Sequence, residues 1–258
     1  MKGPHLWIPS FRPDRHATLR LFCLPYAGGN SQVFHSWKEY LPPRVDVCPV
    51  ELPGHGSRIR EPLIKDFDTL LESLFNGLQP YLDMEFIFFG HSMGAQLAFG
   101  LAHLLRRVHG PEPRHLFLSG QKPPSLSPPS TALHTLPDAA LARELGRLNG
   151  TSQKVLNDKD LMQVLLPILR ADYSITETFE HPPGPPLSCG ITLFGGLADP
   201  EASRQELGCW QEHTTSSAAI FMLPGDHFFI HSSQGLLLRV LTRKIGQLPA
   251  HRPVLHPA

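Results

Sequence analysis

Residues 86–94 read Phe-Ile-Phe-Phe-Gly-His-Ser-Met-Gly, an apolar run that ends in a Gly-x-Ser-x-Gly pattern. Four bulky apolar residues in a row are typical of a strand covered on both faces, as in a parallel sheet. Where such a strand turns directly into a helix, the serine sits on a sharp, strained turn with its hydroxyl held above the sheet. The stretch therefore predicts a strand, a turn and a helix, and it makes Ser92 the candidate nucleophile.

The residues after Ser92 have the apolar spacing of a helix that lies on a sheet. Apolar side chains recur at three- and four-residue intervals between Ala95 and Val108. Gly94, Ala95 and Ala98 are small, which lets the helix approach the sheet just beneath the serine. An ordinary strand-to-helix turn would show the same five-residue pattern, so the role of Ser92 depends on partners elsewhere in the chain.

Length and composition indicate one α/β domain. With 258 residues the chain is long enough for one large core and short for two, so we expect a single domain over 1–258. The formal net charge is zero, which gives no electrostatic support for nucleic acid or an anionic membrane as partner. The first twenty residues lack the apolar segment of a signal peptide, and no run of about 20 apolar residues follows. We therefore expect a cytoplasmic protein.

The four cysteines and fifteen histidines show no metal-site spacing, since neither C-x-x-C nor H-E-x-x-H occurs. Cys23, Cys48 and Cys189 lie in apolar, strand-like runs, and Cys209 lies in a predicted helix. They are expected to be small buried hydrophobes rather than disulfide partners. The sequence predicts no metal site.

Strands and helices alternate along most of the chain, which favours parallel pairing through right-handed crossovers. Strands are expected at 19–24, 45–52, 86–89, 116–118, 191–194 and 219–223. Helices are expected at 31–40, from 66 to 82, after Ser92, at 203–213 and at 234–245. The order predicts an α/β fold with a mostly parallel, doubly wound sheet.

Residues 119–190 separate two of these strands, far more than one crossover helix requires. Helical spacing within them predicts helices at 138–148 and 158–178. Pairs of prolines mark the rims of this insertion, at 123–124, 128–129, 182–183 and 185–186. We expect a helical lid at about 121–186; an extra structural subdomain without substrate contact is the alternative.

A serine nucleophile needs a base, and the base needs a group that fixes its tautomer. On doubly wound hydrolase sheets, the acid and then the histidine follow the nucleophile, each in a loop after a strand. Asp199 in FGGLADP and His227 in LPGDHFF stand at such positions, so we assign Asp199 as the orienting acid and His227 as the base. Asp226 is the rival acid, but adjacent residues seldom aim their side chains at one point.

The oxyanion of the reaction needs two hydrogen-bond donors. The N–H of Met93, the residue after the nucleophile, should be one. The second should come from PYAGGN at 25–30, a glycine-rich loop where backbone N–H groups approach a ligand without side-chain obstruction. Ala27 is our choice, with Tyr26 and Gly28 one step away. A plain tight turn is the alternative, and a phosphate loop is disfavoured because neither phosphate-loop pattern occurs here.

Together these motifs resemble the discrete type II thioesterases of polyketide and nonribosomal peptide synthetases, a group that includes the medium-chain thioesterase of fatty acid synthesis. The resemblance runs from about Leu19 to Ile245 and rests on LFCLPYAGGNSQVF, VELPGHGSRIREP, FFGHSMGAQLAF, LPILRADYSITETF, FGGLADP, WQEHT and LPGDHFF. It implies the α/β-hydrolase fold, a triad of Ser92, Asp199 and His227, and an oxyanion hole at Ala27 and Met93. It also implies a mobile helical lid around 136–178.

The resemblance also implies an activity. Such enzymes hydrolyse acyl and aminoacyl groups from the phosphopantetheine arm of acyl or peptidyl carrier proteins, and so release stalled or aberrant units. They need no cofactor, and we expect a monomer. From the residues alone, a carboxylesterase or lipase acting on free small esters stays open, as does a catalytically silent binding protein on this fold.

Carrier proteins are generally acidic, so a thioesterase of zero net charge should meet them through a local basic patch. The sequence offers Arg58, Arg60 and Lys65 after the second strand, or Lys154 and Lys159 in the lid. Ordinary solvated charge is the alternative for each of them singly.

Overall fold

The centre of the molecule is one six-stranded parallel sheet, with strand order β2-β1-β3-β4-β5-β6. The strands are β1 (Leu19–Leu24), β2 (Val45–Pro49), β3 (Phe86–His91), β4 (His115–Ser119), β5 (Gly190–Gly196) and β6 (Ala218–Leu223). This structure, a computed structural model, describes residues 6–12, 14–126, 132–147, 150–151, 153–180 and 184–248. The expected proline pairs at 128–129 and 182–183 lie outside these residues.

The strand order reverses between β1 and β3. From β1 the chain first adds β2 on one side, then returns to place β3 on the other side and continues outward to β6. In open parallel sheets such a reversal opens a crevice at the carboxyl ends of the two strands, because their following loops diverge. The glycine-rich loop after β1 and the turn at Ser92 therefore lie side by side.

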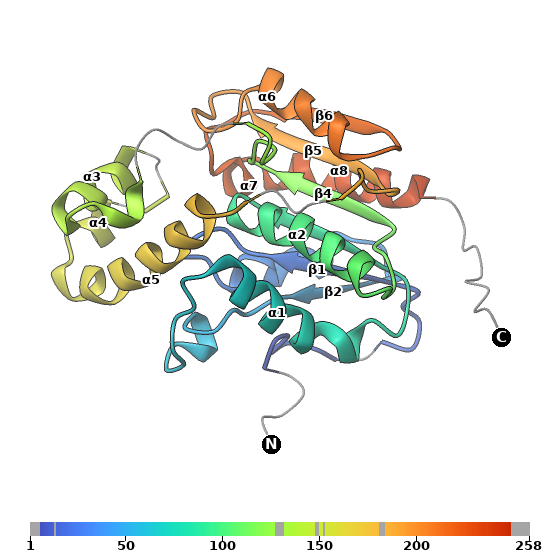
Figure 1. Cartoon of the computed structure of the whole chain (residues 1–258), viewed down its shortest axis with the longest axis horizontal. Helices are drawn as coiled ribbons and strands as arrows, with labels where there is room; N and C mark the ends of the chain where they lie inside the picture. The colour runs from blue at the N-terminus through green and yellow to red at the C-terminus, as the bar shows by residue number, and fades with distance from the viewer. Residues whose placement is uncertain are drawn as a thin grey trace.

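Helices cover both faces of the sheet (Figure 1). On one face lie α1 (Phe67–Leu78) and α2 (Met93–Arg107), and on the other lies α8 (Gln234–Gln247). The shorter α6 (Arg204–Gly208) and α7 (Phe229–Ser232) follow β5 and β6. Short 3-10 helices stand at Ser31–Glu39, Gly56–Arg58, Gln79–Tyr81, Leu133–Thr135 and Cys209–His213.

Strand β3 shows why the sheet is covered on both faces. Phe86 and Phe88 belong to the hydrophobic core formed with α1 and α2, whereas Ile87 and Phe89 belong to the core formed with α8. Successive side chains of a strand point to opposite faces, so four apolar residues in a row supply both cores. All residues of β3 are buried, which fixes the position of the turn that follows.

The insertion between β4 and β5 carries α3 (Asp138–Arg147), α4 (Gln153–Leu156) and α5 (Lys159–Glu177). These helices lie to the left of the sheet in Figure 1, beyond its carboxyl edge. They have a small hydrophobic core of their own, formed by Leu141, Leu145, Met162 and Leu169, and Ala27 of the main body packs against it. The insertion therefore sits over the crevice rather than on a face of the sheet.

The predicted α/β fold is confirmed, and most strands agree with expectation to within one or two residues. The second strand is shorter than predicted and ends at Pro49, because Glu51 leaves the sheet and its N–H donates to the carbonyl of Trp7. The helix expected at 31–40 is a 3-10 helix, and the one expected at 203–213 divides into α6 and a 3-10 turn. Four-residue helices such as α4 and α7 are too short to show a periodicity, so the sequence did not predict them.

The expectation for the cysteines is half right. All four are free thiols, and Cys23 and Cys48 are buried in the sheet. Cys189 and Cys209 are only half-buried, because they lie just before β5 and at the end of α6 rather than inside the core.

Candidate active site

Ser92 occupies the turn between β3 and α2. Its φ of +53° and ψ of −117° lie outside the regions that residues with a side chain prefer, so the turn is strained. Its N–H donates to the Ser119 carbonyl at the end of β4, 2.8 Å away. A Cβ on Gly94 would lie 2.1 Å from the Leu24 carbonyl oxygen, so only glycine lets α2 begin this close to β1. The pattern thus places a strained, half-buried serine at the carboxyl edge of the sheet.

Asp199 and His227 meet beyond the ends of the adjacent strands β5 and β6. The Nδ1 atom of His227 lies 3.1 Å and 3.0 Å from the two carboxylate oxygens of Asp199. The Asp199 side chain is fully enclosed, and the N–H of Glu201 also donates to it, at 2.8 Å. Because the carboxylate accepts the Nδ1 proton, Nε2 is the basic nitrogen of a neutral His227. His227 and Ser92 line the same cavity, of about 440 Å³.

The other candidates near this pair have different surroundings. Asp226 Oδ1 accepts the N–H of Phe228 at 2.9 Å, which shapes the loop before α7. His91 lies beneath the turn, with Nδ1 2.8 Å from the Ser119 hydroxyl, and does not line the cavity. Burial, and then repulsion from His227 whenever that ring is protonated, hold the pKa of His91 well below its ordinary value, so His91 is neutral.

The two expected oxyanion donors follow neighbouring strands. Ala27 comes after β1 and Met93 is the first residue of α2, and the ends of β1 and β3 pair directly. Within the described residues, neither N–H donates to another protein group. Ala27 lines the cavity beside Ser92, and Met93 adds the positive end of a helix. Ala27 and Met93 therefore stay the candidate donors for a tetrahedral oxyanion at Ser92.

A buried hydrogen-bond network next to Ala27 was not predicted from the sequence. Asp172 of α5 accepts the N–H of Gly28 at 2.7 Å, and the same carboxylate oxygen lies 2.9 Å from Nε2 of His55. Burial alone would lower the pKa of His55, but the hydrogen bond and the negative charge of Asp172 outweigh it, so the pKa lies above its ordinary value. The only signal in the sequence is a charged residue on the apolar face of a predicted helix.

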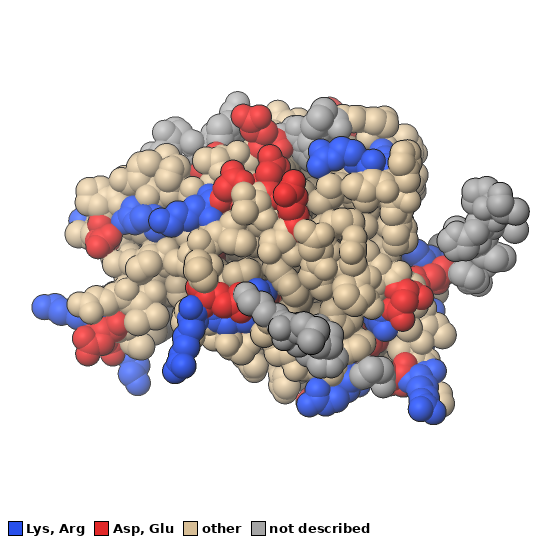
Figure 2. Space-filling model, turned by 60° about the horizontal axis from the view of Figure 1, so that its bottom comes forward, with Lys and Arg blue, Asp and Glu red and all other residues tan. Residues whose placement is uncertain are grey.

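Charged side chains of both signs line the mouth of the cavity. Arg147 of α3 pairs with Glu144 at 2.8 Å and reaches Glu201 on the main body at 3.3 Å. Arg143 and Lys122 line the same opening. Figure 2 shows a similar mixture over one face of the molecule, with small groups of basic and acidic side chains among broad uncharged areas.

The first basic patch proposed from the sequence is wrong in one of its members. Arg58 is buried and donates to the Glu51 carbonyl at 3.0 Å and to both carboxylate oxygens of Glu61, at 3.0 Å and 2.8 Å. Its guanidinium is therefore used inside the protein. Arg60 and Lys65 are exposed, as are Lys154 and Lys159 of the insertion, so these four stay candidates for a partner surface.

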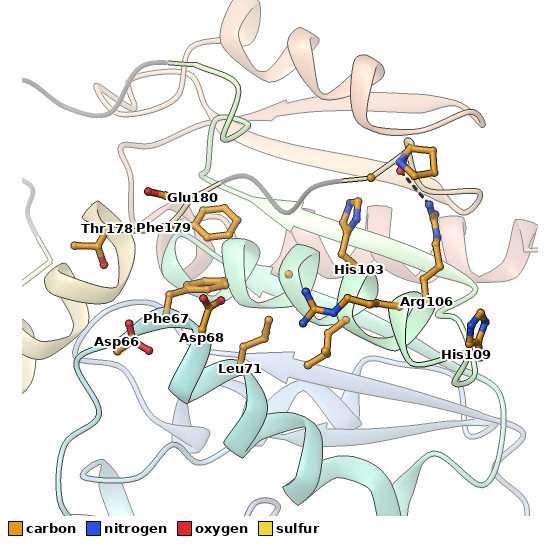
Figure 3. Close-up of a pocket in the computed structure, with 15 residues that line it drawn as sticks. Asp66, Phe67, Asp68, Leu71, His103, Arg106, His109, Thr178, Phe179 and Glu180 are labelled. Atoms are coloured by element: carbon orange, nitrogen blue, oxygen red, sulfur yellow. Dashed lines mark hydrogen bonds between the residues drawn. The ribbon is translucent and has the colours of Figure 1, made fainter.

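A second hollow, of about 660 Å³, lies between α1, the later turns of α2 and residues 178–180 and 184–185 (Figure 3). Figure 3 shows Asp66, Asp68 and Glu180 toward one end and His103, Arg106 and His109 toward the other. Neither Ser92 nor Asp199 nor His227 lines it.

In the part of the chain that the structure describes, no group of three or more His, Cys, Asp or Glu side chains is arranged to hold a metal ion. No helix among those residues is long and apolar enough to cross a membrane.

Several known proteins are similar to this chain over most of its length. A family model described as "Thioesterase domain" matches residues 19–245. The RedJ thioesterase from the prodiginine biosynthetic pathway in Streptomyces coelicolor is 37% identical, with a TM-score of 0.84 over 94% of this chain and 100% of that one. The type II thioesterase BorB from the borrelidin biosynthetic cluster is 34% identical, with a TM-score of 0.83 over 92% and 97% of the two chains.

A further relative bears a different name. The linear gramicidin dehydrogenase LgrE of Brevibacillus parabrevis is 41% identical over 93% of this chain and 92% of its own length. The word dehydrogenase is part of the relative's name; the present sequence contains no G-x-G-x-x-G run, the usual pyrophosphate loop of nicotinamide enzymes. The family model and the solved relatives show that the chain belongs to the thioesterase family, on the α/β-hydrolase fold.

Proposed function

We propose that this chain hydrolyses acyl or aminoacyl thioesters carried on the phosphopantetheine arm of carrier proteins, and so clears stalled or aberrant units in polyketide or nonribosomal peptide biosynthesis. The observation that carries the proposal is the buried Asp199–His227 pair, which shares one cavity with the strained Ser92. Membership of the thioesterase family supplies the reaction class.

The residues support a double displacement. His227 Nε2 takes the Ser92 proton while Ser92 Oγ attacks the thioester carbonyl, and the oxyanion is held by the N–H groups of Ala27 and Met93. Each such donor is typically worth about 3 kcal/mol in the transition state. His227 then gives its proton to the leaving thiolate, and the acyl group stays on Ser92.

Water completes the cycle. His227 Nε2 takes a proton from the water as it attacks the acyl-serine and then gives that proton to Ser92 Oγ, so the acid and free Ser92 result. Asp199 keeps Nδ1 protonated and stabilises the imidazolium in both halves, without taking a proton itself. The proposal needs no cofactor, since every proton transfer is assigned to His227.

The proposal extends to the setting of the reaction. We take 1–258 as one hydrolase domain, with the insertion at about 121–186 as a lid over an acyl pocket. The enzyme would act as a monomer in the cytoplasm, with an acyl or peptidyl carrier protein as its partner. Arg60 and Lys65, or Lys154 and Lys159, would face that acidic partner, because their side chains are exposed.

The test is hydrolysis of matched substrates. Hexanoyl thioesters on carrier protein and hexanoyl p-nitrophenyl ester should differ, with kcat/KM higher for the carrier-bound thioester. A higher kcat/KM for the free ester would favour a carboxylesterase. The absence of an acyl-Ser92 adduct by mass spectrometry, together with no turnover of any substrate, would indicate a binding protein.

A further inference from the structure

The loop that supplies the Ala27 N–H is a tight turn. Gly29 N–H donates to the Tyr26 carbonyl at 2.8 Å, which closes a four-residue turn over 26–29. Its third residue, Gly28, has a φ of +76°, the value that a type II turn requires at this position. The N–H of Gly28 belongs to the central peptide, whose flip distinguishes a type II from a type I turn. Whatever holds this N–H therefore selects the shape of the turn.

Asp172 holds the central peptide from α5. Its Oδ2 accepts the Gly28 N–H at 2.7 Å and the Nε2 proton of His55 at 2.9 Å. The Pro53 carbonyl, 3.0 Å from Nδ1 of His55, accepts the other ring proton. Asp172 and His55 are only 1% and 4% exposed, so water does not compete for these bonds. A charged carboxylate forms a stronger hydrogen bond with the Gly28 N–H than a neutral acceptor would.

The insertion also packs on the same turn. A Cβ on Gly28 would lie 2.8 Å from Cδ2 of Leu169, one helical turn before Asp172 in α5. On the other side, the Tyr26 hydroxyl is 2.8 Å from Nε2 of His231 in α7. Asp172 itself does not line the cavity, whereas Ala27 does. Asp172 therefore reaches the reaction through the turn and not through contact with the substrate.

We propose that Asp172, supported by His55, is a positioning residue that holds the Tyr26–Gly29 turn so that the Ala27 N–H points at the oxyanion. Because Asp172 belongs to the insertion, the oxyanion hole is complete only while α5 is seated against the turn. The insertion thereby controls the chemical step as well as access to the cavity. This inference rests on the proposed thioesterase activity and on Ala27 as a donor.

The experiment compares Asp172→Ala and Asp172→Asn with the wild-type chain and with a matched control. Asp138→Ala is that control, because Oδ1 of Asp138 accepts from Arg170 of α5 at 2.6 Å, and neither of these residues lines the cavity. Each protein is assayed for kcat and KM on a hexanoyl carrier-protein thioester and for thermal unfolding. Each is also titrated with a trifluoromethyl ketone, which forms a tetrahedral oxyanion on Ser92, and with a thioether that mimics the bound substrate.

The two kinds of inhibitor separate positioning from folding. Asp172→Ala should lower kcat by about 100-fold, the usual effect of losing one oxyanion donor, with little change in KM. The trifluoromethyl ketone should bind more weakly by a similar factor, while affinity for the thioether is unchanged. Asp172→Asn keeps an acceptor for Gly28, so its losses should lie between those of Asp172→Ala and the wild type. Asp138→Ala should keep kcat and both affinities, whatever its melting temperature.

The inference is overturned if the Asp172 variants melt earlier but keep kcat and the affinity for the trifluoromethyl ketone, since Asp172 would then be only structural. If Asp172→Ala does not fold, Asp172→Asn decides the question by the same ratio of affinities. Failure of the wild-type chain to hydrolyse any thioester would instead contradict the proposed function.

Discussion

The hollow beside Ser92 and the hollow between α1 and α2 differ more in their linings than in their sizes. The first measures about 440 Å³ and the second about 660 Å³. Only the first brings a strained serine to the same cavity as a histidine held by a buried carboxylate. In the second hollow, Nη1 of Arg106 donates hydrogen bonds to the carbonyls of Pro185 and Pro186, at 3.0 Å and 3.1 Å. A strained serine and a carboxylate-paired histidine in one hollow are therefore a better indicator of an active site than the volume of the hollow.

The largest expected effect comes from removing the nucleophile. Ser92→Ala should lower kcat on a carrier-protein thioester by about 10⁴-fold or more, because only binding and the oxyanion donors would remain. Steady-state hydrolysis checks the loss, and a melting curve serves as the folding control. A variant that kept most of its turnover would remove the distinction between the two hollows.

A smaller loss should follow from changing the orienting acid. Asp199→Asn keeps the shape of the pair but presents an amide to Nδ1, which favours the wrong tautomer of His227. A loss of about 10³- to 10⁴-fold in kcat is expected at neutral pH. The pH profile of kcat is the measurement. Near-normal kcat would transfer the role of acid to another residue, with Asp226→Asn as the next variant to measure.

The buried His55–Asp172 pair, close to the hollow beside Ser92, should make the stability of the fold depend on pH. The pKa of His55 in the fold is raised above its ordinary 6.5. The protonated ring therefore contributes fully to the free energy of unfolding below about pH 6.5, and this contribution is lost as the pH rises through the raised pKa. The melting temperature of the wild type should therefore fall in that window relative to His55→Gln. Parallel curves for the two proteins would show that His55 carries no charge in the fold.

The smallest effect is expected from the second hollow. Asp68 and Arg107 are exposed in its lining, and reversing their charges in Asp68→Lys and Arg107→Glu should change kcat and KM less than about twofold. Assays on the carrier-protein thioester and on a small thioester of the same acyl group provide the check. A rise in KM for the carrier-bound substrate alone would instead indicate that this hollow is part of the surface that docks the carrier protein.

Sequence reasoning worked best where the signal is local. The apolar run 86–89 and the glycines around Ser92 predict strand, turn and helix, since strand alternation, helical spacing and close packing act within a few residues. It failed where a side chain finds its partner far along the chain. Arg58 appeared to be a solvated cation, but the turn at 56–58 brings it back onto Glu51 and Glu61 inside the protein.

The sequence by itself therefore determined a parallel α/β sheet, a strained serine at the end of its third strand, and the order in which Asp199 and His227 follow. Tertiary structure alone decided that Asp172 of the insertion bonds the Gly28 N–H beside the proposed oxyanion donor, 144 residues earlier in the chain. The physical reason is that periodicity is set by neighbouring residues. Contact between α5 and the first loop depends instead on strand order and on where the insertion packs.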